Sequence, residues 1–261
     1  EITASYTANE ERTLYYNREE SDGKPNRIPA IATAPNGDIF AISDHRPCGN
    51  DIGFGEVDLV CRLLLEKKNT WTESRTIADG LGHINDGIWK LGFGDPAIVA
   101  DRESNKVLVM SVCGNVTCHN GNYGAGTAET PENPNRVSRL YIEHNGEKWV
   151  YGQPEEVTYN IYPLFKDKDD KVHVATLFIG AGKICQSRVV KKGEYYRLYC
   201  AVWAKRNPDD QHHNYVIYSD DFGQTWHLLG DLGYENAPSK WGNEPKCEEL
   251  PDGTVVLSSR K

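Results

Sequence analysis

The apolar residues of this chain fall into short runs that either alternate with polar positions or stay apolar for only a few residues. The runs are rich in Val, Ile, Tyr, Phe and Trp, which are the side chains that favour strands. No segment keeps apolar residues at the i, i+3, i+4, i+7 spacing through several turns, as a long amphipathic helix requires. The pattern predicts an all-β protein.

Turn signals separate these runs at eight places, which we interpret as hairpin tips. Such turns favour Asn-Gly and Asp-Gly because they need positive φ, which glycine adopts without steric cost. The predicted tips are residues 35–38, 66–69, 102–105, 145–146, 166–170, 191–193, 220–224 and 251–253. So many hairpins exceed one sandwich and favour a radial array of small sheets, a β-propeller, with about four blades at two hairpins per blade.

The organisation predicted for residues 1–261 is a single propeller domain. Residues 113–135 are rich in Gly, Asn and Pro and too polar for a strand, which predicts a long surface loop. A ring that stops after about four blades leaves open sheet edges. We therefore expect this chain to be the N-terminal portion of the propeller, completed by blades from beyond Lys261, for example an associated C-terminal fragment of the same protein.

One eight-residue stretch, residues 219–226 (SDDFGQTW), fits the pattern S-x-D-x-G-x-T-W, which is known as an Asp box and as the BNR repeat. Asp221 is expected to accept backbone N–H groups across the turn, Gly223 to supply the positive φ, and Trp226 to bury its ring. These are structural roles on a turn between the third and fourth strands of a blade. Weaker echoes are residues 64–71 and 142–149.

The composition narrows the possible partners. The chain is 38% apolar and 26% charged, which is typical of a folded globular protein, and its net charge is −9. An acidic chain without a Lys/Arg-rich run argues against a nucleic-acid partner. No run approaches the roughly 18 to 20 apolar residues that a membrane span needs. The chain opens at Glu1 without a visible targeting segment, so we expect a processed product.

Seven scattered cysteines do not form the disulfide framework of a small secreted domain. Cys113, Cys118 and His119 have no second ligand pair at zinc spacing, so we expect loop or core thiols there and no metal site.

The candidate chemistry gathers where strands begin and end. Residues 26–51 (NRIPAIATAPNGDIFAISDHRPCGND) place Arg27 at the start of one predicted strand and Asp44, Arg46 and Asp51 at the end of the next. Arg27-Ile28-Pro29 followed by this hairpin resembles the start of the catalytic domain of sialidases (neuraminidases, glycoside hydrolase family 33), whose hallmark is R-I-P followed by Asp boxes.

Two later elements carry the same resemblance in the same order. They are GDPAIVADRESNKV from Gly94 and NEPKCEELPDGTVVLSSR from Asn243. The separations of 24 positions from Arg27 to Asp51 and 16 from Glu244 to Arg260 agree with bacterial members. The amino-acid sequence of the first element is most similar to those of sialidases of gut Bacteroidetes.

The resemblance implies a six-bladed propeller and an exo-α-sialidase. Arg27 and Arg260 match two of three arginines that bind the substrate carboxylate, and the third is expected beyond Lys261. Asp51 matches the general acid and base on a mobile loop. Glu244 matches the residue that activates a tyrosine nucleophile, which is also expected beyond Lys261. Arg46 and Asp95 match positions that contact polar substituents of the sugar.

The chemistry explains these residue types. The planar fork of arginine binds a carboxylate bidentately and keeps its charge. A neutral tyrosine avoids the repulsion that a carboxylate nucleophile would meet from the acid group of sialic acid, and sialidases are the known exception among glycosidases in this respect.

Other functions remain open at this stage. A non-catalytic glycan-binding propeller would keep the arginines, but an acid and a base together favour an enzyme. A trans-sialidase, including an intramolecular one, differs only in what attacks the intermediate. The resemblance further implies sialylated glycans as substrates, no cofactor, and a secreted, periplasmic or cell-surface location in a bacterium. It gives Asp44 no role.

Overall fold

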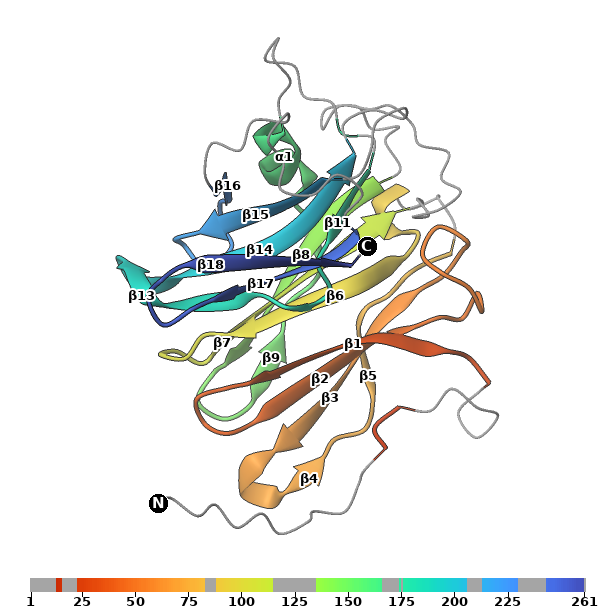
Figure 1. Ribbon diagram of the computed structural model, residues 1–261. Coiled ribbons are helices and arrows are strands. Elements are labelled where there is room, and N and C mark those ends of the chain that lie inside the picture. Colours follow the sequence, from red (N-terminus) through yellow and green to blue (C-terminus); the bar gives the residue numbers. More distant parts are fainter. Residues whose placement is uncertain are drawn as a thin grey trace.

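The computed structural model describes residues 13–15, 23–82, 88–114, 135–165, 174, 176–205, 213–229 and 243–260. Nearly all of its regular elements are strands, as the sequence pattern predicts (Figure 1). The strands are β1 (Asn26–Thr33), β2 (Ile39–His45), β3 (Asp58–Leu65), β4 (Thr70–Trp71), β5 (Arg75–Ala78), β6 (Phe93–Ala100), β7 (Lys106–Gly114), β8 (Asn135–His144), β9 (Trp149–Tyr151), β10 (Glu155–Glu156), β11 (Thr176–Ile179), β12 (Gly182–Lys183), β13 (Cys185–Lys192), β14 (Tyr195–Lys205), β15 (His213–Ser219), β16 (His227–Leu228), β17 (Asn243–Glu249) and β18 (Val255–Arg260).

In the described part of the chain, four short helical segments interrupt the strands. They are η2 (Glu66–Lys68), η4 (Ile88–Lys90), α1 (Thr158–Ile161) and η5 (Tyr162–Leu164). The spacing of apolar residues did not predict them, because a single turn is too short to show a helical period. None of the helices in the described ranges has the length and apolar character that a bilayer crossing requires.

The strands form four sheets. The first is β1-β2-β3-β4 with β5 against β3, and the second is β10-β8-β7-β6-β12 with β9 against β8. The third is β11-β14-β15-β16 with β13 against β14, and the fourth is the pair β17-β18. Contacts between β1 and β6 and between β14 and β17 place the sheets side by side (Figure 1). The arrangement is part of a β-propeller and agrees with the predicted number of about four blades, the fourth represented by two strands.

Six of the eight predicted hairpin tips lie between strands that are consecutive in the chain, and residues 166–170 fall outside the described part. The tip predicted at 191–193 is displaced, because Lys191 and Lys192 still belong to β13. In the turn between β13 and β14, the residue with positive φ is Gly193, at the end of the predicted range. Both ends of the loop predicted at 113–135 belong to strands, since β7 ends at Gly114 and β8 begins at Asn135, and residues 115–134 lie outside the described part. Cys113 pairs with Arg136 in the ladder of β7 and β8, so strand pairing continues where polar composition suggested a loop. Cys113 is a buried strand thiol, and Cys118 and His119 lie outside the described residues.

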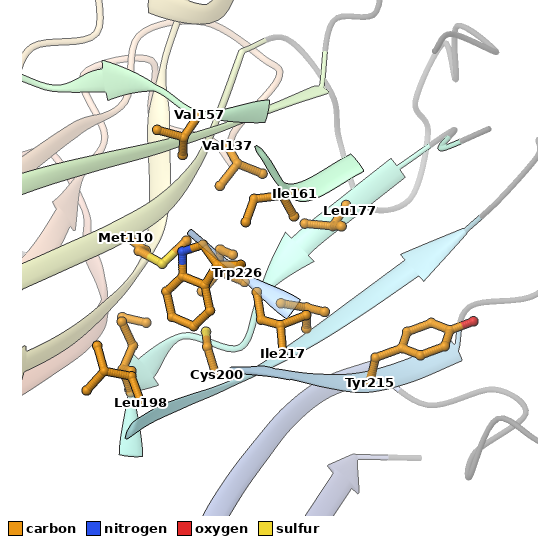
Figure 2. Packing of buried hydrophobic residues seen from close by; sticks show 14 of the residues in the cluster. Met110, Val137, Val157, Ile161, Leu177, Leu198, Cys200, Tyr215, Ile217 and Trp226 are labelled. Atoms are coloured by element: carbon orange, nitrogen blue, oxygen red, sulfur yellow. The ribbon is translucent and has the colours of Figure 1, made fainter. Parts of the chain in front are cut away.

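The larger core fills the space between the second and third sheets (Figure 2). Every second residue of β14 points into it, and these residues are Leu198, Cys200, Val202 and Ala204. Met110 and Val137 face them from the second sheet. Full burial of a side chain of this size stabilises the fold by about 1.5 to 3 kcal/mol. This packing fixes the angle between neighbouring sheets and so the positions of strand ends that carry the site.

The Asp box has the structural roles that the motif predicts. Oδ1 of Asp221 accepts the backbone N–H of Thr225 at 2.8 Å, and φ at Gly223 is 84°. Trp226 is buried in the larger core, as Figure 2 shows. From the second sheet, Arg139 donates to the carbonyl oxygen of Gly223 at 2.8 Å. This turn therefore joins the third sheet to the second.

Candidate active site

One pocket contains all six residues that the sequence singles out. Its volume is about 220 Å³, and it lies at the end of the strands opposite to the hairpin tip at 35–38. The six residues come from three different sheets and from the loop after β2. They are Arg27, Arg46, Asp51, Asp95, Glu244 and Arg260. The structure therefore brings together side chains that are more than 200 positions apart in the sequence.

The innermost strands of three sheets share an unusual backbone feature at this pocket. Ile28 in β1, Asp95 in β6 and Glu244 in β17 have φ values of 51°, 52° and 43°. Each is a residue with a Cβ in the left-handed region, which is uncommon and, for a β-branched residue such as Ile28, a clear outlier. Each is followed by proline, in R-I-P, G-D-P and N-E-P.

Each of these places is a bulge in the strand ladder. In all three, the left-handed residue and its proline stand opposite one serine of the next strand, because the register shifts by one. The serines are Ser43, Ser111 and Ser259. A bulge of this kind bends the strand and re-aims a side chain, and proline is tolerated there because it has no N–H to give to the ladder. The bulges direct Ile28, Asp95 and Glu244 to one pocket, which they all line.

The third sheet has a different break at the equivalent level. Between Ile179 and Cys185 its inner edge leaves β14, and the intervening β12 pairs with β6 of the second sheet instead. The inner edge of every sheet is thus interrupted beside the site.

The Asp51 loop is held by one arginine and one buried side chain. Nη2 of Arg46 lies 3.0 Å from Oδ1 of Asp51 and 3.0 Å from Oδ2 of Asp44. The same Oδ1 of Asp51 accepts the N–H of Ile52 at 2.8 Å. Ile52 is 2% exposed and packs with Phe178 and Trp203. The carboxyl group of Asp51 itself is 43% exposed, so a ligand in the pocket can reach it.

The two remaining arginines differ in their surroundings. Nη1 of Arg260 lies 2.9 Å from Oε2 of Glu244, so these two side chains form an ion pair across β17 and β18. Arg27 has no ion-pair partner among the residues that the structure describes, and the backbone of this residue is fixed by Ser43, whose hydroxyl donates to the Arg27 carbonyl oxygen at 2.8 Å. A cation without a partner at the rim of a pocket is suited to bind an anion.

Acidic groups crowd the pocket and the buried space behind it. Burial, followed by the negative charge of Asp51, raises the pKa of Asp95 to about 7. Burial, followed by the charge of Asp95, raises the pKa of Asp44 well above its ordinary value. Burial also lowers the pKa of Lys246, which lines an adjoining cavity of about 190 Å³ together with Asp95 and Glu244. Perturbed carboxyl groups that converge in a cleft are a physical mark of a functional site.

The sequence did not point to two aromatic residues of the pocket. Phe178 of β11 and Trp203 of β14 stack with ring centroids 4.7 Å apart and an interplanar angle of 4°. They line the pocket as its apolar wall. No motif marks them, because an apolar residue at an inward strand position reads as ordinary core. Ile28 belongs to the same group, and the proline after it is the signal that could have identified its bulge.

Glu244 is distinct from the two acidic residues near it in the sequence. Glu249 is buried, and its Oε1 and Oε2 accept the Ser187 hydroxyl and the Arg188 N–H, both at 2.5 Å. Glu248 pairs with Lys183 at 2.5 Å. Both connect β17 to neighbouring strands, whereas Glu244 faces the pocket.

Two other places in the described part of the chain have features of a site but not this convergence. A cavity of about 860 Å³ lies among the hairpin tips of the first two sheets and contains none of the six residues. Carboxylate oxygens of Glu56, Asp58 and Asp79 lie within 4.8 Å of one another. However, Oδ1 of Asp58 already accepts the Gly80 N–H at 2.8 Å, and its Oδ2 lies 3.4 Å from His45.

Comparison with known proteins gives one consistent result. No family model matches the chain. A sialidase from Micromonospora viridifaciens is 28% identical over 243 residues, which are 92% of this chain and 33% of the relative. A sialidase from Paraclostridium sordellii is 23% identical over 257 residues, which are 97% of this chain and 57% of the relative. The chain thus spans between about a third and somewhat more than half of the length of these curated relatives.

Solved structures agree in fold. The Hadza microbial sialidase Hz136 matches with a TM-score of 0.68 at 21% identity, over 90% of this chain and 42% of that one. Trypanosoma rangeli sialidase, as a covalent intermediate with 2,3-difluorosialic acid, matches with a TM-score of 0.62 at 18% identity, over 90% and 34%. The leech intramolecular trans-sialidase with 2,7-anhydro-Neu5Ac matches with a TM-score of 0.63 at 12% identity, over 96% and 49%. The resemblance to sialidases and the propeller fold are confirmed, while the particular resemblance to enzymes of gut Bacteroidetes stays a prediction.

Proposed function

We propose that this chain is part of the catalytic domain of an exo-acting, retaining sialidase, which removes terminal α-linked sialic acid from glycoconjugates. The observation that carries the proposal is the convergence of three arginines, two aspartates and one glutamate from three sheets on one pocket of about 220 Å³. Sialidases among the relatives and among the similar folds support it.

The arginines recognise the acid group of the sugar. Arg27, which has no ion-pair partner in the described part of the chain, and Arg260 bind the carboxylate of sialic acid. The fork of each guanidinium matches the two carboxylate oxygens and keeps its charge at every working pH. Arg46 and Asp95 contact polar substituents of the sugar ring.

Asp51 and Glu244 donate and accept the protons of the reaction. Asp51, exposed to the pocket and held by Arg46, donates a proton to the leaving sugar and then removes one from the attacking water. Glu244 takes the proton of a tyrosine that attacks the anomeric carbon; the tyrosine and a third arginine are supplied from outside this chain. The Trypanosoma rangeli structure, described as a covalent intermediate, is in line with such a two-step reaction.

An intramolecular trans-sialidase is the second candidate. Its support is the leech enzyme, a similar fold that holds 2,7-anhydro-Neu5Ac. In that reaction a hydroxyl of the sugar attacks the intermediate in place of water, so the residues of this pocket keep the same roles.

The cellular location that we propose follows from the proposed substrate. Sialylated glycoproteins, glycolipids and oligosaccharides are met outside the cytoplasm, so we place the protein in the periplasm, at the cell surface or in the medium of a bacterium. The propeller is closed by further blades from the remainder of the same protein.

The test is a fluorogenic sialoside assay on the intact protein, with NMR identification of the first product. Release of α-sialic acid supports the retaining hydrolase, and 2,7-anhydro-sialic acid supports the intramolecular reaction. Replacement Asp51→Ala is expected to lower kcat/KM by about 10² to 10⁴, the usual contribution of a general acid or base. Binding of a sialoside without any turnover would show a lectin-like propeller and overturn the proposal.

A further inference from the structure

The candidate site rests on a buried carboxyl group that does not line the pocket. Asp44 lies in β2, where it pairs with Arg27 of β1 and Leu59 of β3. It is 0% exposed. A carboxyl group is rarely buried completely, because removing it from water is costly unless its oxygens are well partnered.

The partner of this carboxyl group is Arg46. Oδ2 of Asp44 accepts a hydrogen bond from Nη2 of Arg46 at 3.0 Å, and the same nitrogen lies 3.0 Å from Asp51. Nε of Arg46 is buried without a hydrogen-bond partner. In the described part of the chain, Asp44 and Asp51 are therefore the two groups that orient this guanidinium.

The backbone of the next sheet holds Asp44 in place. Gly94 of β6 comes so close that a Cβ at this position would lie 3.3 Å from Oδ2 of Asp44. Asp44 is thus fixed from two sides, by its own strand and by β6. By contrast, the carboxyl group of Asp51 is on a loop and 43% exposed. Of the two groups that hold Arg46, Asp44 is the one that the fold immobilises.

The charges around Arg46 indicate that the carboxyl group of Asp44 is protonated and neutral. Asp44, Asp51 and Asp95 lie close to this single guanidinium, and Oδ1 of Asp44 has no hydrogen-bond partner. Burial and the charge of Asp95 disfavour the ionised form of Asp44. A neutral carboxyl group still accepts a hydrogen bond through its carbonyl oxygen. A neutral Asp44 does not neutralise the positive charge of Arg46, so this charge can interact with Asp51 and with a ligand.

We propose that Asp44 is a positioning residue, which as a neutral hydrogen-bond acceptor holds the Arg46 guanidinium against the Asp51 loop. The inference rests on the proposed function, which gives Arg46 and Asp51 their roles. Asp44 itself touches no substrate.

The test compares two substitutions in the intact protein. Asp44→Asn has nearly the same shape, no charge and one acceptor oxygen, so it is expected to keep kcat/KM within about threefold of the original protein. Asp44→Ala removes the acceptor and is expected to lower kcat/KM by about 10- to 100-fold. Equal losses in both variants would overturn the neutral-acceptor role. Asp101→Ala serves as the matched control, because Asp101 is also buried but accepts from Ser104 and Gln186 at a hairpin tip.

A double-mutant cycle separates positioning from general stability. In an Arg46→Ala background, Asp44→Ala is expected to change kcat/KM by less than twofold, because the group that it positions is gone. An undiminished loss in that background would overturn the inference.

NMR of the arginine side chains makes the test independent of turnover. The Arg46 guanidinium should give slowly exchanging Nη–H signals in the original protein and in Asp44→Asn, and averaged signals in Asp44→Ala. Absence of sialidase activity with this NMR pattern intact would refute the proposed function alone. Identical Arg46 spectra in all three proteins would refute the positioning role.

Discussion

The Oε2 atom of Glu244 lies 2.9 Å from Nη1 of Arg260, so the proposed base and one of the arginines proposed to bind the substrate carboxylate form an ion pair. Both side chains are more than half exposed, at 52% and 58%. A pair of this kind contributes at most about 1 kcal/mol to stability. Under the proposed function, the sugar carboxylate is expected to compete with Glu244 for Arg260.

This competition predicts the kinetics of Glu244→Gln. The amide cannot take a proton, so kcat is expected to fall by about 10² to 10³. The amide also no longer neutralises Arg260, so KM is expected to stay constant or fall. Steady-state rates with a fluorogenic sialoside measure both constants. A raised KM with kcat unchanged would contradict the assigned role.

Arg27 is expected to tolerate no replacement by lysine. It has no ion-pair partner in the described ranges, and its fork is needed for two parallel hydrogen bonds to a carboxylate. Arg27→Lys should raise KM about tenfold, and Arg27→Ala should lower kcat/KM by about 100-fold or more. Arg102→Lys is the matched control, since Arg102 is an exposed arginine that stacks on Tyr196 away from the pocket. Similar effects at both positions would argue against a carboxylate clamp.

The free energy of unfolding should depend on pH through Asp95. Burial and Asp51 raise the pKa of Asp95 to about 7 in the folded protein, whereas an unfolded aspartate titrates near about 3.9. Between these pH values the folded state binds the extra proton, so stability is greatest at the acidic end and falls as the pH rises to about 7. The loss at this one group is on the order of 4 kcal/mol, and Asp44 acts in the same direction.

Replacement Asp95→Asn removes this dependence. Urea unfolding between pH 4.5 and 8 should show a flatter profile for the variant, with its largest gain relative to the original protein above pH 7. A profile parallel to that of the original protein would show that Asp95 is not protonated in the folded state.

The Asp box should affect stability without affecting turnover. Asp221 accepts the N–H and the hydroxyl of Thr225 and the hydroxyl of Ser219. Asp221→Ala should therefore lower the free energy of unfolding by about 1 to 3 kcal/mol. Its kcat/KM should stay within about twofold below the unfolding transition. Thr225→Val, which keeps the backbone N–H, should lower the free energy of unfolding by less than Asp221→Ala does. A large loss of kcat in a folded Asp221→Ala protein would place the box in the catalytic machinery.

The residues of the pocket were predictable where the chemistry restricts the choice of side chain. A carboxylate site needs arginine, and proton transfer needs an acid or base. By resemblance to sialidases, the element that begins with R-I-P predicted Arg27 and Asp51, the G-D-P element predicted Asp95 and the N-E-P element predicted Glu244, and all four line one pocket. Phe178 and Trp203 could not be found in this way, because many apolar side chains can form such a wall. Asp44 was noted at the end of its strand, but the sequence could not settle its role, because its burial depends on Gly94 of another sheet, and such a contact leaves no local pattern.

The fold, too, was predictable where local sequence determines the structure and not where long-range pairing does. Hairpin tips were predicted well where Asn-Gly or Asp-Gly determines the turn over a few residues, as at 35–38, 145–146 and 251–253. The limits of the 113–135 segment were not, because the ladder between β7 and β8 continues through Cys113 and Asn135 despite their polar neighbours. Cross-strand pairing there outweighs local composition.

The left-handed positions at 28, 95 and 244 have one more consequence. The chain takes the same bend whether the side chain is isoleucine, aspartate or glutamate, so the backbone does not dictate what chemistry is displayed there. The three positions share one backbone conformation and differ in their side chains. Because position 28 lies in such a bulge and lines the pocket, a substitution there is expected to change the pocket wall without rebuilding a loop.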